Sequence, residues 1–278
     1  MKRRALLLWL LLGLALPARA ADLADGWVAL ADYRAEAALR IFSAEAKATD
    51  PAVVRLAELG RGVTLLALQP VSQAQIEQAR SILSALTENQ ADEAALGAWF
   101  YLARIAQHHR AQAEPAEAAR CYRRLLELAP DSAWAQSALG RLALLELYAP
   151  DGRGTLEQRF ARVSDLLGLA RTPEARCDLH WLMAEAVAFH RLPEARALPH
   201  LIAAEETGRL DVVTRPDVLV QIAELARRTG EAALAREYYL RFLRDYPRDN
   251  RDYLVRQRLA ALDAAPVAPV AEPAMLAP

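Results

Sequence analysis

Residues 217–249, DVLVQIAELARRTGEAALAREYYLRFLRDYPRD, contain the pattern that decides the fold of this 278-residue chain. Apolar side chains at Leu219, Ile222 and Ala226 recur three and four positions apart, so they share one face of a helix. Gly230 follows that helix, and glycine accepts the left-handed backbone conformation in which many helices end. The first half of the stretch therefore predicts an amphipathic helix followed by a tight turn.

The second half of the stretch predicts another helix that packs back on the first. Ala223 and Ala235 are small where two antiparallel helices would cross closely. Tyr239 and Phe242 supply the bulk that would fill the space toward a further helix, and Pro247 ends the helix. The whole stretch thus predicts a helical hairpin.

The same order of residues recurs elsewhere, which argues against an isolated hairpin. A second full copy contains Trp99, Leu102, Ala103, Ala106, Ala118, Tyr122, Leu125 and Pro130. Weaker copies begin at Leu59, Leu139 and Leu182. The pattern resembles the tetratricopeptide repeat (TPR), whose two-helix units of about 34 residues stack on one another. The resemblance covers residues 31–262 and implies an all-α superhelical solenoid of about five to six stacked antiparallel hairpins.

Helical periodicity continues between prolines along the rest of the chain. The predicted helices span 24–48 with a break near Asp32, 52–68, 73–87, 92–109, 115–128, 132–148, 155–170, 174–190, 194–207, 216–228, 231–245 and 249–262. Prolines at the junctions fit these boundaries, because proline opens or ends helices. No run alternates apolar and polar residues between turn glycines, so no sheet is predicted. We expect 21–262 to form one TPR-like domain.

The two ends of the chain differ from the repeats. Residues 1–20 combine a basic start, an apolar run of about a dozen residues and a final Ala-Arg-Ala, which is typical of a secretory signal peptide cleaved before Ala21. An uncleaved anchor is the alternative. No other apolar segment is long enough to cross a membrane, so we expect an exported, periplasmic or secreted protein without stable membrane insertion. Residues 263–278 are rich in alanine and proline and predict a disordered tail, with a docking peptide as the alternative.

The charge balance argues against nucleic acid as a partner. The chain has 34 Lys and Arg residues and 35 Asp and Glu residues, and residues 1–20 hold four of the basic side chains but no acidic one. The exported part is therefore acidic, whereas proteins that bind nucleic acid present a basic face. Arginine supplies nearly all of the positive charge, which fits a GC-rich genome.

The sequence contains no motif of enzymatic or metal chemistry. The five histidines are His108, His109, His180, His190 and His200. None of them forms the four-residue helical spacing of a metal site, and there is no nucleophile elbow or phosphate-binding glycine loop. We therefore predict no catalytic residue, metal ligand or cofactor. His108 and His109 end a predicted helix, where a cation would interact with the helix dipole.

The two cysteines could form a disulfide bond, because an exported compartment permits one. Cys121 and Cys177, however, lie on hairpins that are not adjacent. Stacked hairpins would hold their α carbons beyond the roughly 7 Å limit for a disulfide bond. We therefore predict two buried free thiols.

A series of arginines predicts a binding surface. In tetratricopeptide repeats the first helix of each hairpin lines a concave groove, and the residue after the leucine-small pair faces that groove. The resemblance assigns this position to Arg61, Arg104 and Arg141. The same resemblance adds Phe100, Gln107, His108, Trp134, Glu224, Arg227 and Arg228.

This set lacks the lysine and asparagine of the carboxylate clamp in chaperone-binding members of the family, so that ligand is not carried over. Three aligned cations instead predict an extended partner segment that bears carboxylates, with Phe100 and Trp134 as apolar anchors. The alternative is an ordinary solvated surface on a chain rich in arginine.

The resemblance implies a non-enzymatic scaffold of the bacterial periplasm or cell envelope that binds a protein or peptide. An envelope-assembly or cell-division coordination factor is a more specific alternative, because the Tyr-Leu-x-Phe ending at Phe242 resembles repeats of such proteins. Those proteins often carry a lipid-anchor cysteine or a trimerising coiled coil, and this sequence shows neither. A helical accessory domain of an envelope enzyme is a third alternative, although only the short tail follows residue 262. The repeat pattern does not indicate an oligomeric state.

Overall fold

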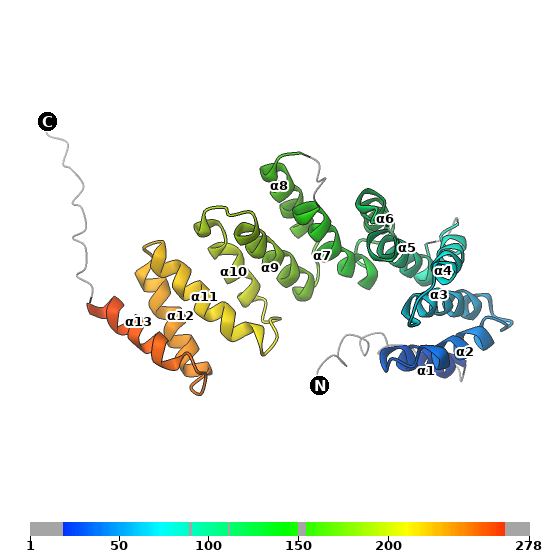
Figure 1. Cartoon of the computed structure of the whole chain (residues 1–278), viewed down its shortest axis with the longest axis horizontal. Coiled ribbons are helices and arrows are strands. Elements are labelled where there is room, and N and C mark those ends of the chain that lie inside the picture. Colours follow the sequence, from blue (N-terminus) through cyan, green and yellow to red (C-terminus); the bar gives the residue numbers. More distant parts are fainter. Residues whose placement is uncertain (1–18, 89–90, 111, 150–153, 265–278) are drawn as a thin grey trace. The chain divides into compact units, whose positions relative to one another are not determined.

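A computed structural model describes residues 19–88, 91–110, 112–149 and 154–264. All regular elements in these ranges are helices, and the chain divides between Arg171 and Thr172 into two compact units, unit 1 and unit 2 (Figure 1). The sequence predicted a single repeat domain over this region. The predicted signal peptide, except for its last two residues, and the predicted tail, except for its first two, lie outside the described residues.

Unit 1 contains four helical hairpins. Their helices are α1 (Arg19–Ala31) and α2 (Ala35–Glu45), α3 (Pro51–Ala67) and α4 (Gln73–Leu86), α5 (Glu93–Arg104) and α6 (Pro115–Leu128), and α7 (Ala133–Tyr148) and α8 (Leu156–Leu167). A π-helical turn, η3 (Ile105–His109), extends α5. Each helix packs on the next, and α3 also contacts α1 and α5, while α5 contacts α7. We call α1, α3, α5 and α7 together the first-helix layer.

Unit 2 contains two hairpins and a final helix. Its elements are α9 (Pro173–Phe189), the short 3-10 turn η4 (Glu194–Arg196), α10 (Leu198–Glu206), α11 (Thr214–Arg228), α12 (Ala232–Asp245) and α13 (Asp252–Ala264). Helix α13 packs on α12. The predicted all-α, TPR-like repeat of neighbouring antiparallel helices is therefore confirmed.

Local sequence explains where the helices begin and end. Most first helices start at a side chain that accepts a hydrogen bond from the backbone of the first turn, which satisfies an otherwise unpaired N–H group. These capping residues are Asp50, Asp92, Ser132 and Thr172. The predicted helix 24–48 is divided by a turn in which Tyr33 has a left-handed φ of 60°. This break near Asp32 creates the first hairpin, so the described chain has six hairpins and one closing helix.

Large side chains and glycines interlock at the helix crossings. Phe42, Tyr122, Tyr239 and Phe242 are fully buried. A side chain at Gly60 would collide with the ring of Phe42, so this crossing depends on glycine. The helices of the first-helix layer are therefore held at fixed positions by packing, which determines where their remaining polar residues lie.

Candidate partner-binding site

Arg104 and Arg141 lie on neighbouring helices of the first-helix layer, α5 and α7. Both side chains are partly buried, and neither forms an ion pair or hydrogen bond within the described part of the chain. Burial lowers the pKa of His108, and the charges of Arg104 and Arg141 lower it further. Burial raises the pKa of Tyr122 to about 12, and the same two arginines oppose that rise. The four groups therefore lie within electrostatic reach of one another, and we call them the arginine site.

Arg104 is held by its apolar surroundings rather than by an acid. Its guanidinium lies 5.8 Å from the ring centre of Tyr101. Its Nε atom is buried without a hydrogen-bond partner. An unsatisfied donor on a charged group is costly unless a partner supplies an acceptor. The Arg104 side chain therefore carries a charge that no acid of the described chain neutralises.

The π-helical turn η3 shapes the edge of the arginine site. The backbone N–H of Glu114, just before α6, donates to the carbonyl of Ala106 across 2.8 Å and so ties the start of α6 to η3. Gln107 then accepts a hydrogen bond from the hydroxyl of Tyr122 at 3.3 Å. Because Gln107 is neutral, this bond leaves the charge of the site positive.

The aromatic residues predicted as anchors have different roles. Phe100 is 8% exposed and packs against the rings of Tyr101, Tyr122 and Trp134, with ring centres 5.5 to 5.8 Å apart. Phe100 is therefore packed in the core and offers a partner little surface, unlike the apolar anchor that the sequence predicted. Trp134 is only partly buried, and its indole N–H donates to Glu93 at 2.5 Å. Trp134 retains surface that a partner could contact.

Arg61, the first arginine of the predicted series, has an acidic partner. Its guanidinium lies 2.5 Å from a carboxylate oxygen of Glu58, one helical turn earlier on α3. Three cations in a row were predicted, and two of them, Arg104 and Arg141, form no ion pair within the described residues. The signal was present in the sequence, since a glutamate three residues before an arginine favours such a pair.

The residues predicted in unit 2 are also paired. Glu224 accepts hydrogen bonds from Tyr239 and from Arg227, the latter at 2.8 Å. Burial raises the pKa of Glu224, but these bonds and the charges of Arg227 and Arg258 outweigh burial and lower it. Arg228 lies 3.0 Å from Glu194. These three residues neutralise one another or their neighbours within unit 2.

The histidines at the end of α5 are not the predicted cations. Burial is the main cause that lowers the pKa of both His108 and His109, and the charge of Arg104 adds to it. Neutral imidazoles are therefore favoured near pH 7, and the expected charge–dipole interaction is not supported. Within the described residues no group of three or more His, Cys, Asp and Glu could hold a metal ion.

Both cysteines are free and buried, as predicted. Burial, together with the nearby carboxylate of Glu117, raises the pKa of the Cys121 thiol to about 12. Burial also raises the pKa of Cys177. Both thiols are therefore protonated at neutral pH and lack the thiolate that nucleophilic chemistry requires.

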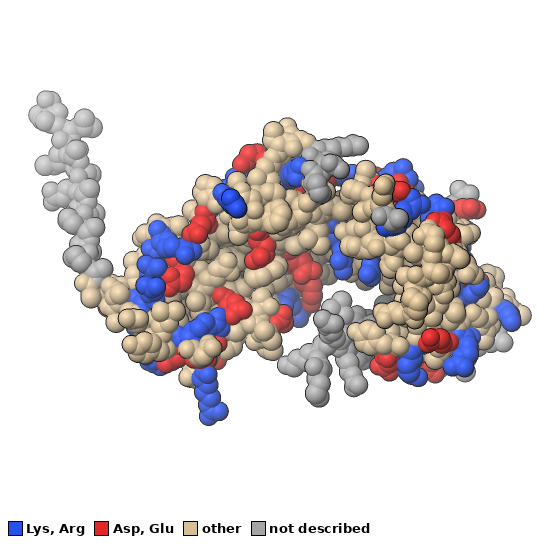
Figure 2. All heavy atoms as spheres, viewed as in Figure 1, with Lys and Arg blue, Asp and Glu red and all other residues tan. Residues whose placement is uncertain are grey.

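Charges of both signs are interspersed on the face of the molecule shown in Figure 2, over both units. This distribution differs from the continuous basic face that nucleic-acid-binding proteins present. None of the helices among the described residues combines the length and apolarity needed to cross a membrane.

Tyr122 is the member of the arginine site that sequence reasoning missed as a site residue. Its spacing identified it as a core residue, and its ring is indeed fully buried. Only its position between α5 and α7 reveals that its hydroxyl lies in the field of two arginines. No local sequence signal indicates this position.

Comparison with known proteins supports the repeat. No curated protein matches this chain. Residues 217–249 match the family model described as Tetratricopeptide repeat, and this match coincides with α11 and α12. Helical repeats of this kind are typically non-catalytic and bind other proteins. The chain therefore contains a segment similar to a tetratricopeptide repeat, within an all-helical structure suited to protein–protein interaction.

Proposed function

We propose that this protein is an exported periplasmic scaffold that binds an extended segment of a protein partner along the first-helix layer of unit 1. The observation that carries the proposal is the pair of unpaired arginines, Arg104 and Arg141, on adjacent helices. The signal-like composition of residues 1–20 supports the location.

The arginine site favours a partner segment that carries carboxylates. A guanidinium forms bidentate hydrogen bonds with a carboxylate, and such charged bonds contribute about 1.5–3 kcal/mol when partly desolvated. Arg104 offers a guanidinium that no acid of the described chain pairs, and Arg141 offers a second cation one hairpin further along. Trp134, whose ring packs on Tyr101, supplies partly exposed apolar surface on the same pair of helices. Arginine and tryptophan are both common in binding hot spots.

Capture of the partner tests the proposal. The full chain would be expressed with an affinity tag in its native cells, cross-linked mildly, and recovered from separated periplasmic and cytoplasmic fractions. We expect recovery from the periplasm together with a protein partner whose identity is read by mass spectrometry. The identity of that partner also decides between a general scaffold and a factor of envelope assembly or cell division.

Arg61 provides a matched control for the two unpaired arginines. It occupies the same repeat position but is already paired with Glu58. We expect the double variant Arg104→Gln, Arg141→Gln to weaken partner binding by roughly tenfold or more, whereas Arg61→Gln changes it by about twofold at most. Added salt should weaken wild-type binding, because the Debye length falls from about 10 Å at 0.1 M to about 3 Å at 1 M. Equal capture by the double variant and wild type would contradict the assignment.

A further inference from the structure

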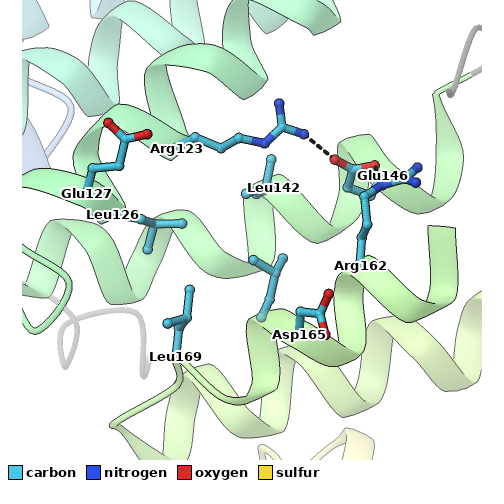
Figure 3. Close-up of a pocket in the computed structure, with 9 residues that line it drawn as sticks. Arg123, Leu126, Glu127, Leu142, Glu146, Arg162, Asp165 and Leu169 are labelled. Carbon is cyan, nitrogen blue, oxygen red and sulfur yellow. Dashed lines mark hydrogen bonds and ion pairs between the residues drawn. The ribbon is translucent and has the colours of Figure 1, made fainter. Parts of the chain in front are cut away.

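A hollow of about 350 Å³ lies on unit 1 between α6, α7 and α8 (Figure 3). Leucines from all three helices line it, and charged side chains surround them. The leucines are Leu126, Leu142, Leu166 and Leu169. We call this hollow the leucine pocket. It is distinct from the arginine site, with which it shares no residue.

The leucine pocket has a buried floor and an accessible edge. Leu142 and Leu166 are buried, with 2% and 9% of their surface exposed, whereas Leu169 is 36% exposed. Leu169 is one of the few large apolar residues of the described chain that remain this exposed. Covering the exposed leucine would remove apolar surface from water, which favours an apolar occupant.

A second hollow on unit 1 differs from the leucine pocket in its lining. It has about 400 Å³ between α4, α5 and α6, but its charged residues satisfy one another or their neighbours. Arg110 pairs with Glu114, and Arg120 pairs with Glu117. Its lining is mainly polar side chains with locally satisfied charges, so nothing in it specifies a ligand.

The charged residues around the leucine pocket differ in whether they form ion pairs. Two arginines, Arg123 and Arg162, both bind the single carboxylate of Glu146, the second of them at 2.8 Å. Figure 3 shows Arg123 reaching across toward Glu146 at one side. Asp165, also in the lining, is exposed and forms no ion pair within the described residues. Glu127, the third carboxylate of the lining, pairs with Arg124 at 3.1 Å. Asp165 is therefore the one carboxylate of the lining without an ion pair among the described residues.

We propose that the leucine pocket binds a segment of a second protein that inserts one large apolar side chain between the leucines and places an adjacent lysine or arginine against Asp165. The apolar side chain supplies affinity, and the basic residue sets orientation. Asp165 would repel an acidic residue placed against it. This inference does not depend on the arginine site.

Labelled peptides test the proposal with the full chain. Fluorescein-labelled twelve-residue peptides in a Gln/Ser background would carry a single Leu or Phe flanked by Lys, by Gln or by Glu. Fluorescence anisotropy would measure their dissociation constants. We expect the Lys-flanked peptides to bind about two- to fivefold more tightly than the Gln-flanked ones, and the Glu-flanked peptides to bind most weakly.

Two variants sharpen the test. Leu169→Gln should weaken the Lys-flanked peptide by roughly tenfold, because an apolar contact is lost. Leu240→Gln is the matched control, since Leu240 is 43% exposed in unit 2, and it should leave binding unchanged. Asp165→Lys should reverse the preference so that Glu-flanked peptides bind more tightly than Lys-flanked ones. Circular dichroism would establish that each variant folds.

Three results would overturn the inference. One is equal binding of all flanked peptides and of the background peptide without Leu or Phe. Another is an equal effect of Leu169→Gln and Leu240→Gln. The third is a dimer seen by light scattering that Leu169→Gln converts to monomer, because the pocket would then belong to a contact between two copies of this chain.

Discussion

The two full repeats place opposite charges at the same position of the hairpin. Arg104 in unit 1 and Glu224 in unit 2 each follow the apolar-small pair of a first helix, and each lies near a fully buried tyrosine of the second helix. In unit 2 that tyrosine, Tyr239, donates to Glu224. In unit 1 the corresponding Tyr122 donates to Gln107 instead.

The comparison shows that the neighbour one turn away decides whether a charge is free for a partner. Arg227 lies three residues after Glu224 and neutralises it. The corresponding residue after Arg104 is the neutral Gln107, so Arg104 keeps its charge. The same framework of buried tyrosine and small residues thus supports a self-contained ion pair in one repeat and an unpaired cation in the other.

The largest effect should come from removing the shared framework. Tyr122→Ala and Tyr239→Ala should each destabilise the unit that contains them by about 3–5 kcal/mol, because each ring is fully buried. Urea unfolding followed by circular dichroism measures this loss. Tyr253→Ala serves as the control, since this residue is 77% exposed. A loss no larger than that of the control would show that the substituted tyrosine does not stabilise its unit.

Removing only the hydroxyl groups of the two tyrosines should destabilise the two repeats by different amounts. Tyr239→Phe takes a donor from a charged carboxylate and should cost about 1.5–3 kcal/mol. Tyr122→Phe takes a donor from a neutral amide and should cost about 0.5–1.5 kcal/mol. The same unfolding measurement compares the two variants. Equal losses would contradict the idea that the partners of the two tyrosines differ in strength.

Acidification should weaken unit 2 through a histidine pair. Nδ1 of His180 lies 3.1 Å from Nδ1 of His200. Burial, together with the charges of His180 and Arg196, lowers the pKa of His200 to about 4. Between pH 6.5 and about 4 the unfolded chain binds a proton at this site that the folded chain does not, so stability falls as pH falls.

Thermal unfolding at pH 7.5 and pH 5 measures this effect. We expect a lower melting temperature at pH 5, and a smaller difference between the two pH values for His200→Asn. Arg104→Gln, in unit 1, should leave the unit 2 transition unchanged. An equal pH dependence of the wild type and His200→Asn would assign the effect to other groups.

The smallest difference should appear in cysteine reactivity. Both thiols should react with a thiol reagent after unfolding without a reductant, because neither is in a disulfide bond. In the folded protein both should react slowly, and Cys121 more slowly than Cys177. Cys121 is 2% exposed with a pKa raised to about 12, whereas Cys177 is 5% exposed. Mass spectrometry of partially labelled protein reads this order, and faster labelling of Cys121 would contradict it.

The sequence by itself determined the helical repeat. Leu219, Ile222 and Ala226 recur at helical spacing, and Gly230 and Pro247 mark the turn and the end, all through interactions within a few residues of the chain. The Glu58–Arg61 ion pair is also a local feature, because side chains three residues apart meet on one helix.

Only the tertiary structure decided which residues are available to a partner. Phe100 is buried because three rings from α5, α6 and α7 close around it, a contact that no local spacing encodes. Arg104 lacks a local acid because Gln107 is neutral, but only the packing shows that no other helix brings an acid to Arg104 or Arg141. The leucine pocket likewise exists only where three helices meet. Local periodicity sets each helix face, whereas the distances between faces depend on how the hairpins pack, and those distances define both candidate sites.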